Sequence, residues 1–287
     1  MMHANTQDQA GRTFLITGAN AGIGRATAQA LCARGARVHL ACRSQQKTRP
    51  LLEELWQRHG THAAAFLELD LADLDSVRAA AARYLASGEP LSVLINNAGL
   101  AGTRGQATKQ GFEMTMGTNH LGHFLLTQLL LERLKESRAR IVFVSSKSHE
   151  GARTIPFARL REPTRTRTGL REYQWSKLAN VLCANELARK LAGTGVTTYS
   201  LHPGVVRSDI WRRLPTLVRD AMYVVRGMIT SEEGARTTLH CATSADVAMH
   251  TGRYYAKESE VKASAAAGNE ALARALWDWS EGAVTSR

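Results

Sequence analysis

The chain has 287 residues, of which 44% are hydrophobic and 22% are charged. This length allows one large domain or two small ones without disulfides or a structural metal, and the composition excludes a disordered, collagen-like or fibrous protein. Lysine and arginine outnumber aspartate and glutamate by 37 to 25, which favours an anionic partner such as nucleic acid, an acidic membrane or a phosphorylated cofactor, although an arginine-rich proteome would give the same balance.

Strand-like and helix-like segments alternate along the chain, which predicts a mostly parallel sheet of about seven strands with helices on both faces. Because no repeat or flexible linker divides the sequence, we expect residues 1–287 to form a single doubly wound α/β domain. The predicted strands are Arg12–Thr17, Ala36–Cys42, His62–Leu69, Leu91–Asn96, Arg140–Ser145, Val196–Leu201 and an edge strand at Gly252–Tyr255. The predicted helices are Ile23–Arg34, Gln45–Arg58, Leu74–Leu85, Phe112–Lys135, Glu172–Leu191 and Glu270–Trp279.

The cysteines and histidines are scattered. Their spacing matches no zinc pattern, so we expect reduced, mostly buried thiols and no metal. The polar N-terminus lacks the apolar stretch of a signal peptide, and no window of roughly 18 apolar residues could span a membrane. We therefore expect a cytoplasmic protein. The cysteines are Cys32, Cys42, Cys183 and Cys241.

A glycine-rich turn follows the first predicted strand and opens the first helix. It reads Thr17-Gly18-Ala19-Asn20-Ala21-Gly22-Ile23-Gly24. Glycines allow a tight turn and let the backbone approach a pyrophosphate at the positive end of the helix. Similar turns occur without a ligand, but the position within a strand–helix–strand unit favours a dinucleotide site of the Rossmann type.

The end of the second strand indicates which dinucleotide binds. NAD sites usually place an acidic residue there to hold the ribose 2′-hydroxyl, whereas this chain has Arg43 and, directly after Gly24, Arg25. Guanidinium groups pair with a 2′-phosphate through charge-assisted hydrogen bonds. The sequence therefore predicts NADP(H), the alternative being two solvated surface arginines.

Polar residues also follow the third and fourth strands, at the edge where open α/β sheets bind ligands. Asp70 could hydrogen-bond an adenine next to Leu71, or it could cap the following helix. Asn96 and the segment Asn97-Ala98-Gly99 end the fourth strand. This turn either lines the cofactor or is purely structural.

Tyr173 and Lys177 are the candidate reactive pair. Their spacing of four residues places both side chains on one helical face. An unperturbed phenol titrates near pH 10, and a nearby ammonium lowers that pKa, which would make the pair a general acid and base. Ser145 and Ser146 end the fifth strand, where a hydroxyl could hold a substrate carbonyl, although serines at strand ends often only form turns.

Together these motifs resemble the short-chain dehydrogenase/reductase family. The pattern TGxxxGxG, NNAG, YxxxK and His202-Pro203-Gly204 appears in family order between about Thr13 and Trp279. Within the family the chain looks most like the retinol-dehydrogenase-like branch, through TGANAGIGRATAQAL, ACRS, TNHLGHFLLTQLLLERLKES, YQWSKLANVL, LHPGVVRS and LWDWS. That branch prefers NADP(H), in agreement with the two arginines.

The resemblance implies a tetrad of residues with defined roles. Asn119 would organise a water and the lysine, Ser146 would orient the substrate oxygen, Tyr173 would donate the proton during reduction, and Lys177 would hold the nicotinamide ribose and lower the tyrosine pKa. Hydride would pass directly between cofactor and substrate carbon. The cofactor-binding residues implied are Thr17, Gly18, Asn20, Gly22, Ile23, Gly24, Arg25, Arg43, Asp70, Leu71, Asn97, Ala98, Gly99, Tyr173, Lys177, Pro203, Gly204, Val206 and Ser208.

The segment 205–230 alternates apolar residues with arginines at helical spacing. It could be a docked surface helix, a lid over a lipophilic aldehyde or ketone, or an element that touches an anionic membrane surface. Many members of the branch begin with a hydrophobic anchor, and this sequence shows none.

The leading hypothesis is an NADP(H)-dependent oxidoreductase that interconverts an alcohol and an aldehyde or ketone, with a retinal-like compound as the expected substrate. The alternative is a regulatory protein that senses NADP(H) without turnover, which the four tetrad residues argue against. No DNA-binding motif accompanies the positive charge, so we expect no nucleic-acid partner. Family members are often dimers or tetramers, which makes a homo-oligomer an expectation from the resemblance.

Overall fold

The computed structural model describes residues 8–206 and 228–285. These residues build an eight-stranded sheet in the order β3-β2-β1-β4-β5-β6-β7-β8, in which every neighbouring pair is parallel except the last. The expectation of a mostly parallel sheet is confirmed, with a two-residue strand added at its edge. The strands are β1 (Thr13–Thr17), β2 (Arg37–Cys42), β3 (Ala64–Glu68), β4 (Val93–Asn96), β5 (Arg140–Val144), β6 (Thr197–His202), β7 (Arg253–Ala256) and β8 (Ser259–Glu260).

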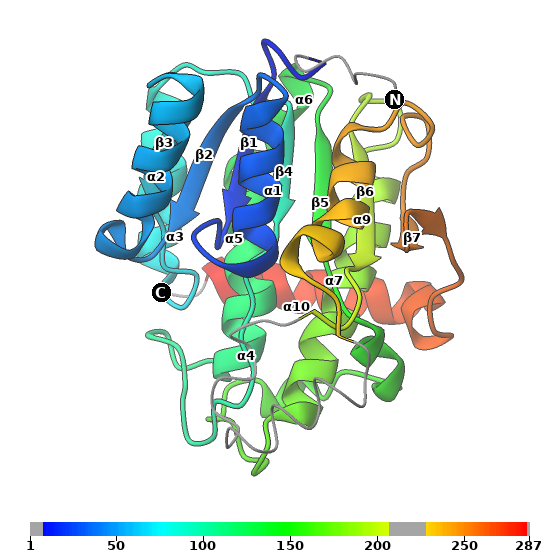
Figure 1. The fold of residues 1–287 in the computed structure, drawn as a ribbon. Coiled ribbons are helices and arrows are strands. Elements are labelled where there is room, and N and C mark those ends of the chain that lie inside the picture. The colour runs from blue at the N-terminus through cyan, green and yellow to red at the C-terminus, as the bar shows by residue number, and fades with distance from the viewer. Residues whose placement is uncertain (1–7, 207–227, 286–287) are drawn as a thin grey trace.

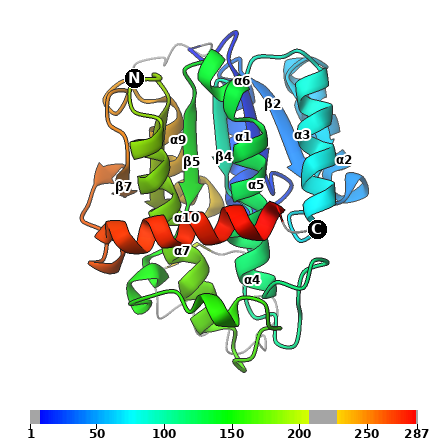
Figure 2. The ribbon, with the colours of Figure 1, turned by 180° about the vertical axis from the view of Figure 1, so that it is seen from behind.

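Helices cover both faces of the sheet (Figures 1 and 2). One face carries α1, α2 and α9, and the opposite face carries α3, α5 and α7. The helices are α1 (Gly22–Ala33), α2 (Gln45–His59), α3 (Leu74–Ala86), α4 (Met114–Met116), α5 (Gly122–Leu129), α6 (Leu131–Glu136), α7 (Leu170–Lys190), α9 (Ser231–Thr243) and α10 (Glu270–Thr285).

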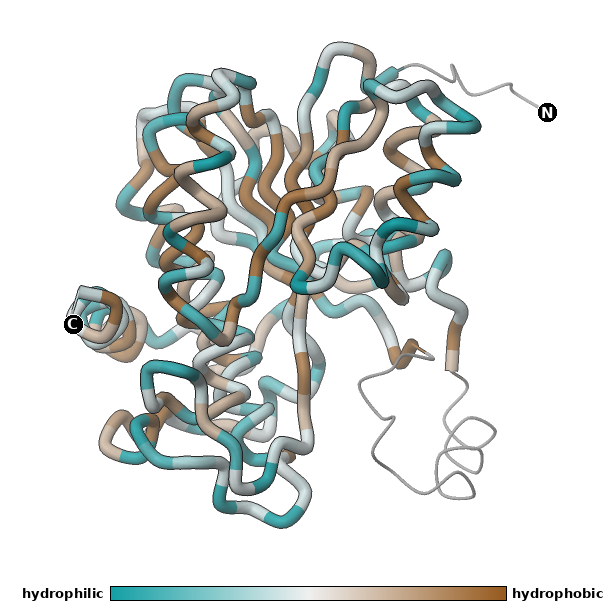
Figure 3. Tube along the Cα trace, turned by 90° about the vertical axis from the view of Figure 1, so that its left-hand side faces the viewer, coloured by the Kyte–Doolittle hydropathy of each residue, from teal (hydrophilic) through white to brown (hydrophobic). Residues whose placement is uncertain are grey.

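Each central strand supplies apolar side chains to both layers, because successive residues of a strand point to opposite faces. In β1, Leu15 packs in the same cluster as Val77 of α3. Its neighbours Phe14 and Ile16 pack in the opposite cluster with Leu31 of α1. Figure 3 shows apolar residues concentrated along the strands. Burial on both faces accounts for the unbroken apolar runs in the sequence.

The strand order places the site. β1 pairs with β2 on one side and with β4 on the other, so the chain winds outward in both directions from this point. Ligands of open α/β sheets bind at such a point, outside the carboxyl ends of the strands. Strands β1, β4 and β5 end at this edge, and α4 and the first turns of α7 extend beyond it (Figure 1).

The prediction of one continuous helix over Phe112–Lys135 is wrong in detail. Glu113 caps α4 by accepting a hydrogen bond from the Met116 N–H. A π-helical turn, Gly117–Leu121, then precedes α5, and a break at Leu130 separates α5 from α6. Such π turns are rare inside helices and recur at functional sites. Asn119 lies in this one.

Two further elements extend the predicted fold. Helix α9 was not predicted, and the pair Thr230 and Glu233 begins it with a capping box. The predicted closing helix is confirmed as α10 and is longer than expected. It crosses the outer side of α5 and α7 (Figure 2), where the Trp277 ring packs edge-on against Phe124 with ring centroids 5.0 Å apart.

All four cysteines are free and buried, as predicted. Among the residues described, no helix is both long and apolar enough to cross a membrane. In the same residues, no group of three or more His, Cys, Asp or Glu side chains is arranged to hold a metal ion. The segment predicted as a lid or membrane contact lies mostly in 207–227, outside the described residues.

Candidate active site

The glycine-rich turn connects β1 to α1 in a backbone shape that needs glycine. Gly18 and Gly22 have φ angles of 65° and 52°, in the left-handed region. A Cβ on Gly24 would lie 2.4 Å from the Gly18 carbonyl oxygen, so the helix start packs directly on the turn. The N-cap residue of α1, Ala21, makes no side-chain cap and the first turn carries no acid. The free N–H groups there fit a diphosphate.

Thr17 joins this turn to the segment after β4. Its hydroxyl accepts hydrogen bonds from the N–H groups of Asn97 and Ala98, both at 2.9 Å. The Asn97 side chain donates to the Thr17 carbonyl at 2.8 Å. A Cβ on Gly18 would lie 3.0 Å from the Ala98 Cβ. The two predicted motifs therefore form one tightly packed unit.

The two arginines expected at the cofactor's adenosine end differ in their surroundings. Arg43 is largely exposed, with one guanidinium nitrogen 4.0 Å from a carboxylate oxygen of Asp70. Arg25 instead donates to Glu54 of α2 at 2.8 Å. Gln29 also donates to Glu54 at 2.8 Å. Arg43 is thus the arginine available to a phosphate, whereas Arg25 would first have to leave a carboxylate.

The structure also places the residues that follow β3. Asp70 accepts a hydrogen bond from the Ala72 N–H at 3.0 Å, which closes a turn, while Asp73 rather than Asp70 caps α3. Leu71 is buried, and its carbonyl oxygen would lie 2.5 Å from a Cβ on Gly122. Leu71 therefore seats the start of α5, and Asp70 lies at the rim beside Arg43.

Tyr173, Lys177 and Ser146 converge where β5 ends. Helix α7 carries the first two, and the Lys177 Nζ lies 5.5 Å from the centre of the Tyr173 ring. Ser146 follows β5 and forms a hydrogen bond with Tyr173. The neighbouring Ser145 is not equivalent, because its hydroxyl donates to the Lys177 carbonyl at 2.7 Å and fastens α7 to the strand.

The pKa of the tyrosine departs from the expectation. Burial raises the pKa of Tyr173 to about 12, and the hydrogen bond with Ser146 only partly offsets this. Burial also lowers the pKa of Lys177 to about 8. The predicted lowering of the tyrosine pKa by the lysine is therefore wrong for the protein alone, because removal from water disfavours the charged form of each group. The phenol is protonated at neutral pH.

Asn119 is held from two sides. Its side chain accepts from the Leu100 N–H at 2.9 Å and donates to the Leu100 carbonyl at 3.0 Å. It also donates to the Ser176 hydroxyl at 3.0 Å, which in turn donates to the Tyr173 carbonyl at 2.9 Å. A Cβ on Gly99 would lie 3.3 Å from the Lys177 Nζ and 3.5 Å from the Asn119 Oδ1, so any larger residue would press on the lysine.

The segment after β6 reaches the same region. Val206 forms an isolated parallel bridge with Ile229. Its side chain would lie 2.5 Å from a Cβ on Gly234, and the side chain of Ile23 would lie 3.3 Å from that Cβ. Val206 therefore lies near Ile23 at the start of α1. Ser208 lies outside the described residues.

Two site residues were missed at the level of sequence. Ser176 links Asn119 to α7, and His123 contacts both Thr17 and Asn119. The spacing Asn119-x-x-x-His123 places the imidazole one helical turn after the asparagine. That spacing is the signal in the sequence that points to this histidine.

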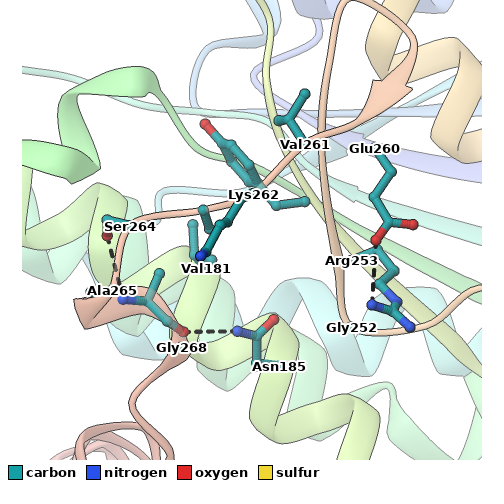
Figure 4. Close-up of a pocket in the computed structure, with 13 residues that line it drawn as sticks. Val181, Asn185, Gly252, Arg253, Glu260, Val261, Lys262, Ser264, Ala265 and Gly268 are labelled. Atoms are coloured by element: carbon teal, nitrogen blue, oxygen red, sulfur yellow. Dashed lines mark hydrogen bonds and ion pairs between the residues drawn. The ribbon is translucent and has the colours of Figure 1, made fainter.

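A separate groove of about 520 Å³ lies at the far edge of the sheet, between α7 and the segment around β8 (Figure 4). An ion pair between Arg253 and Glu260 at 3.3 Å forms part of its wall. Asn185 donates to the Ala267 carbonyl at 2.9 Å on the other side. None of the sequence-predicted site residues in the described part of the chain lines this groove.

The arrangement is suited to proton transfer beside a bound dinucleotide. A protonated phenol, a serine hydroxyl and an ammonium meet at the carboxyl ends of the strands, next to a turn that fits a diphosphate. The serine and phenol can together polarise a carbonyl oxygen, and the phenol can protonate it.

Known proteins resemble the chain along nearly all of its length. The family model described as short chain dehydrogenase matches residues 12–158. Human retinol dehydrogenase 11 is 46% identical over 270 residues, covering 93% of this chain and 84% of that protein. Bovine dehydrogenase/reductase SDR family member 13 is 42% identical over 273 residues, covering 93% of this chain and 72% of that protein.

Solved structures share the fold. An uncharacterised protein of Mycobacterium paratuberculosis has a TM-score of 0.77 at 33% identity, with 99% of this chain and 97% of that chain covered. A Beutenbergia cavernae protein described as an NAD(P)-dependent gluconate 5-dehydrogenase, solved with bound NADP, has a TM-score of 0.71 at 26% identity, covering 88% of this chain and 97% of that chain.

Proposed function

The chain belongs to the short-chain dehydrogenase/reductase family and is an oxidoreductase of alcohol and carbonyl groups, and on that premise we propose that it uses NADP(H) and a tyrosine proton donor. The convergence of Tyr173, Ser146 and Lys177 beside the glycine-rich turn carries this proposal. The cofactor supplies the hydride that adds to, or leaves from, the substrate carbon.

The protein's own residues supply orientation and the proton. The hydroxyls of Ser146 and Tyr173 would hold the substrate oxygen, and Tyr173 would donate its proton as that oxygen gains charge. A buried phenol whose pKa is raised to about 12 carries the proton that this step requires at neutral pH. Lys177 and Asn119 would hold the ribose side of the site. Oxidation of an alcohol would run the same proton transfer in reverse.

NADP(H) is proposed over NAD(H) because of Arg43. Its guanidinium is exposed at the rim where β2 ends. The chain has no acidic residue at the end of β2, where an NAD site usually has one. A lipophilic, retinal-like aldehyde is the proposed substrate, a choice supported by the names of the relatives that the chain resembles.

The decisive experiment follows NADPH oxidation across a panel of aldehydes and ketones that includes retinal and short polar aldehydes. Tyr173→Phe should lower kcat by about a hundredfold to ten-thousandfold, the range expected for loss of a general acid. Tyr84→Phe is the matched control, since Tyr84 is also buried but donates to the Pro90 carbonyl away from the site.

A Tyr173→Phe protein that reduces every accepted substrate as fast as the wild type would refute the proton donor. A wild-type protein that binds NADPH tightly but reduces nothing in the panel would favour the sensor alternative. Greater efficiency with short polar aldehydes than with retinal would refute the lipophilic substrate.

A further inference from the structure

His123 connects the nucleotide-binding turn to the helix that carries Asn119. It is completely buried at the start of α5. Its Nε2 lies 2.8 Å from the Thr17 hydroxyl, and its Nδ1 lies 2.9 Å from the Asn119 carbonyl oxygen. One imidazole therefore bridges the end of β1 and the π-helical turn. His123 is neither one of the four tetrad residues nor one of the cofactor-binding residues that the resemblance implies.

The hydrogen-bond partners determine which ring nitrogen carries the proton. A carbonyl oxygen only accepts, so Nδ1 must donate to Asn119. The Thr17 hydroxyl already accepts from the N–H groups of Asn97 and Ala98. Its own proton has two acceptors in reach, the Ile95 carbonyl at 3.4 Å and Nε2 at 2.8 Å, and the shorter contact is the one to Nε2. The bonds therefore run in one direction, from the segment after β4 through Thr17 and His123 to Asn119. A second ring proton, on Nε2, would make the Thr17 oxygen accept a third hydrogen bond in addition to those from Asn97 and Ala98.

The charge state of the imidazole agrees with this pattern of hydrogen bonds. Burial lowers the pKa of His123 to about 4; the bond to the Asn119 carbonyl opposes this shift and the charge of Lys177 adds to it. The imidazole is therefore neutral at neutral pH and carries no charge to exchange during turnover. Its contribution has to be geometric.

We propose that His123 is a positioning residue, which holds the π-helical turn at a fixed distance from the nucleotide-binding turn and thereby keeps Asn119 in place beside Gly99 and Lys177. This inference rests on the proposed function. Asn119, Gly99 and Lys177 are packed closely, since a Cβ on Gly99 would already touch both the lysine and the asparagine. A shift of the π-helical turn would therefore disturb this packing. The glycine-rich turn keeps its own bond, from Gly18 N–H to the Ala41 carbonyl at 2.8 Å, without His123.

Because the glycine-rich turn does not depend on His123, loss of the histidine should change kcat and the affinity for NADPH to different extents. Loss of the bridge should lower kcat, because displacement of a positioned group by about 1 Å costs up to a hundredfold in rate. The affinity for NADPH should change by less than about threefold, because the donors of the turn stay in place. A merely structural role would lower stability without separating these two quantities.

Three substitutions separate the two bonds. His123→Asn keeps an amide N–H near the position of Nδ1 and can still donate to Asn119. His123→Gln can reach Thr17 only, and His123→Leu makes neither bond. Each substitution breaks at least one of the two bonds of the bridge, so we expect kcat to fall by roughly tenfold to a hundredfold in all three.

His120→Leu is the matched control. His120 is buried on the same stretch of helix, but its Nε2 contacts Ser280 of α10 at 2.8 Å rather than the site. This variant should lose comparable thermal stability and keep its kcat. An equal kcat loss in His120→Leu and His123→Leu would overturn the proposal, as would wild-type kcat in His123→Leu.

A measurement independent of turnover completes the test. In ¹⁵N-labelled wild-type protein, the ring nitrogens of His123 should report a neutral Nδ1–H tautomer, both alone and with NADPH added. A protonated Nε2 would overturn the inference even if every kinetic expectation held. A wild-type protein inactive on all substrates would remove the proposed function, while the tautomer and the NADPH affinities of the variants would still test the bridge.

Discussion

The Nζ of Lys177 donates to the carbonyl oxygen of Val144 at 2.9 Å, so the lysine of α7 is fastened to the last residue of β5. Burial disfavours the charged form of the lysine and lowers the pKa of Lys177 to about 8. The group that would hold the nicotinamide ribose thus loses its charge near physiological pH.

The first prediction concerns pH and activity. Because kcat/KM reports the pKa values of the free enzyme, we expect kcat/KM for NADPH to be constant below pH 8 and to fall about tenfold per unit above it. Lys177→Arg retains a charged group at high pH, so its residual activity should not fall in this range. A wild-type profile that stays flat to pH 10 would contradict the role of the ammonium.

The second prediction tests cofactor choice at Arg43. Charge-assisted hydrogen bonds contribute about 1.5–3 kcal/mol, so Arg43→Ala should raise the KM for NADPH by roughly tenfold to a hundredfold and leave the KM for NADH unchanged. Arg49→Ala provides the control, because Arg49 is an equally exposed arginine of α2 that pairs with Glu53 at 2.7 Å. Equal effects of the two substitutions would show a general charge effect.

The third prediction uses the ion pair between Arg25 and Glu54. If a 2′-phosphate competes with this carboxylate for the guanidinium, Glu54→Gln should tighten NADPH binding by a few-fold, on the order of 1 kcal/mol. Titration calorimetry with NADPH and NADH measures this directly. Tightening of both cofactors to the same extent would argue against a contact with the phosphate.

The fourth prediction concerns the contact around Gly99. In Gly99→Ala the new methyl group would displace the Lys177 Nζ or the Asn119 amide by a few tenths of an ångström. We expect kcat to fall about tenfold or more while the protein remains folded. Gly268→Ala serves as the control, since no atom lies within 4 Å of its added Cβ. Activity is assayed beside thermal melting, and full activity in Gly99→Ala would count against the assembled site.

The fifth prediction concerns stability in acid. Burial lowers the pKa of His120 to about 3 and that of His123 to about 4, below the value near 6.5 expected in the unfolded chain. Between these values the unfolded state binds more protons, so the free energy of unfolding falls as the pH falls from about 6.5 towards 4.

Each of these histidines contributes about 1.4 kcal/mol per pH unit in that window. Denaturant unfolding at pH 7 and pH 5 measures the total for every histidine whose pKa burial lowers, His202 included. The share of this pair should be about 4 kcal/mol at most. His120→Gln should reduce the slope by one residue's share. Equal stability at the two pH values would mean that the rings accept protons without leaving their buried positions.

Local rules were enough to locate the motifs. The strand before Gly18 and the helix after it follow from apolar runs and turn residues. The four-residue spacing of Tyr173 and Lys177 sets them on one helical face wherever α7 lies. Because parallel strands bring their carboxyl ends to one edge, the residues after β1, β4 and β5 were expected to meet, and they do.

Local rules did not reveal partners that are distant in sequence. The pairing of Arg25 with Glu54, the Leu100 and Ser176 contacts of Asn119, and the raised pKa of Tyr173 all depend on which elements pack together. Neither helix propensity nor hydrophobic period distinguishes a π-helical turn from an α-helical one, so the π-helical turn before α5 was missed as well.

The amino-acid sequence by itself therefore determined the family, the alternation of strands and helices, and the identity of the residues at the strand ends, since these depend on short-range periodicity and composition. Only the tertiary structure decided the charge and proton positions of the site. Burial and hydrogen bonds across the sheet set whether Tyr173, Lys177 and His123 hold a proton, and those quantities arise from neighbours that the chain brings together only on folding.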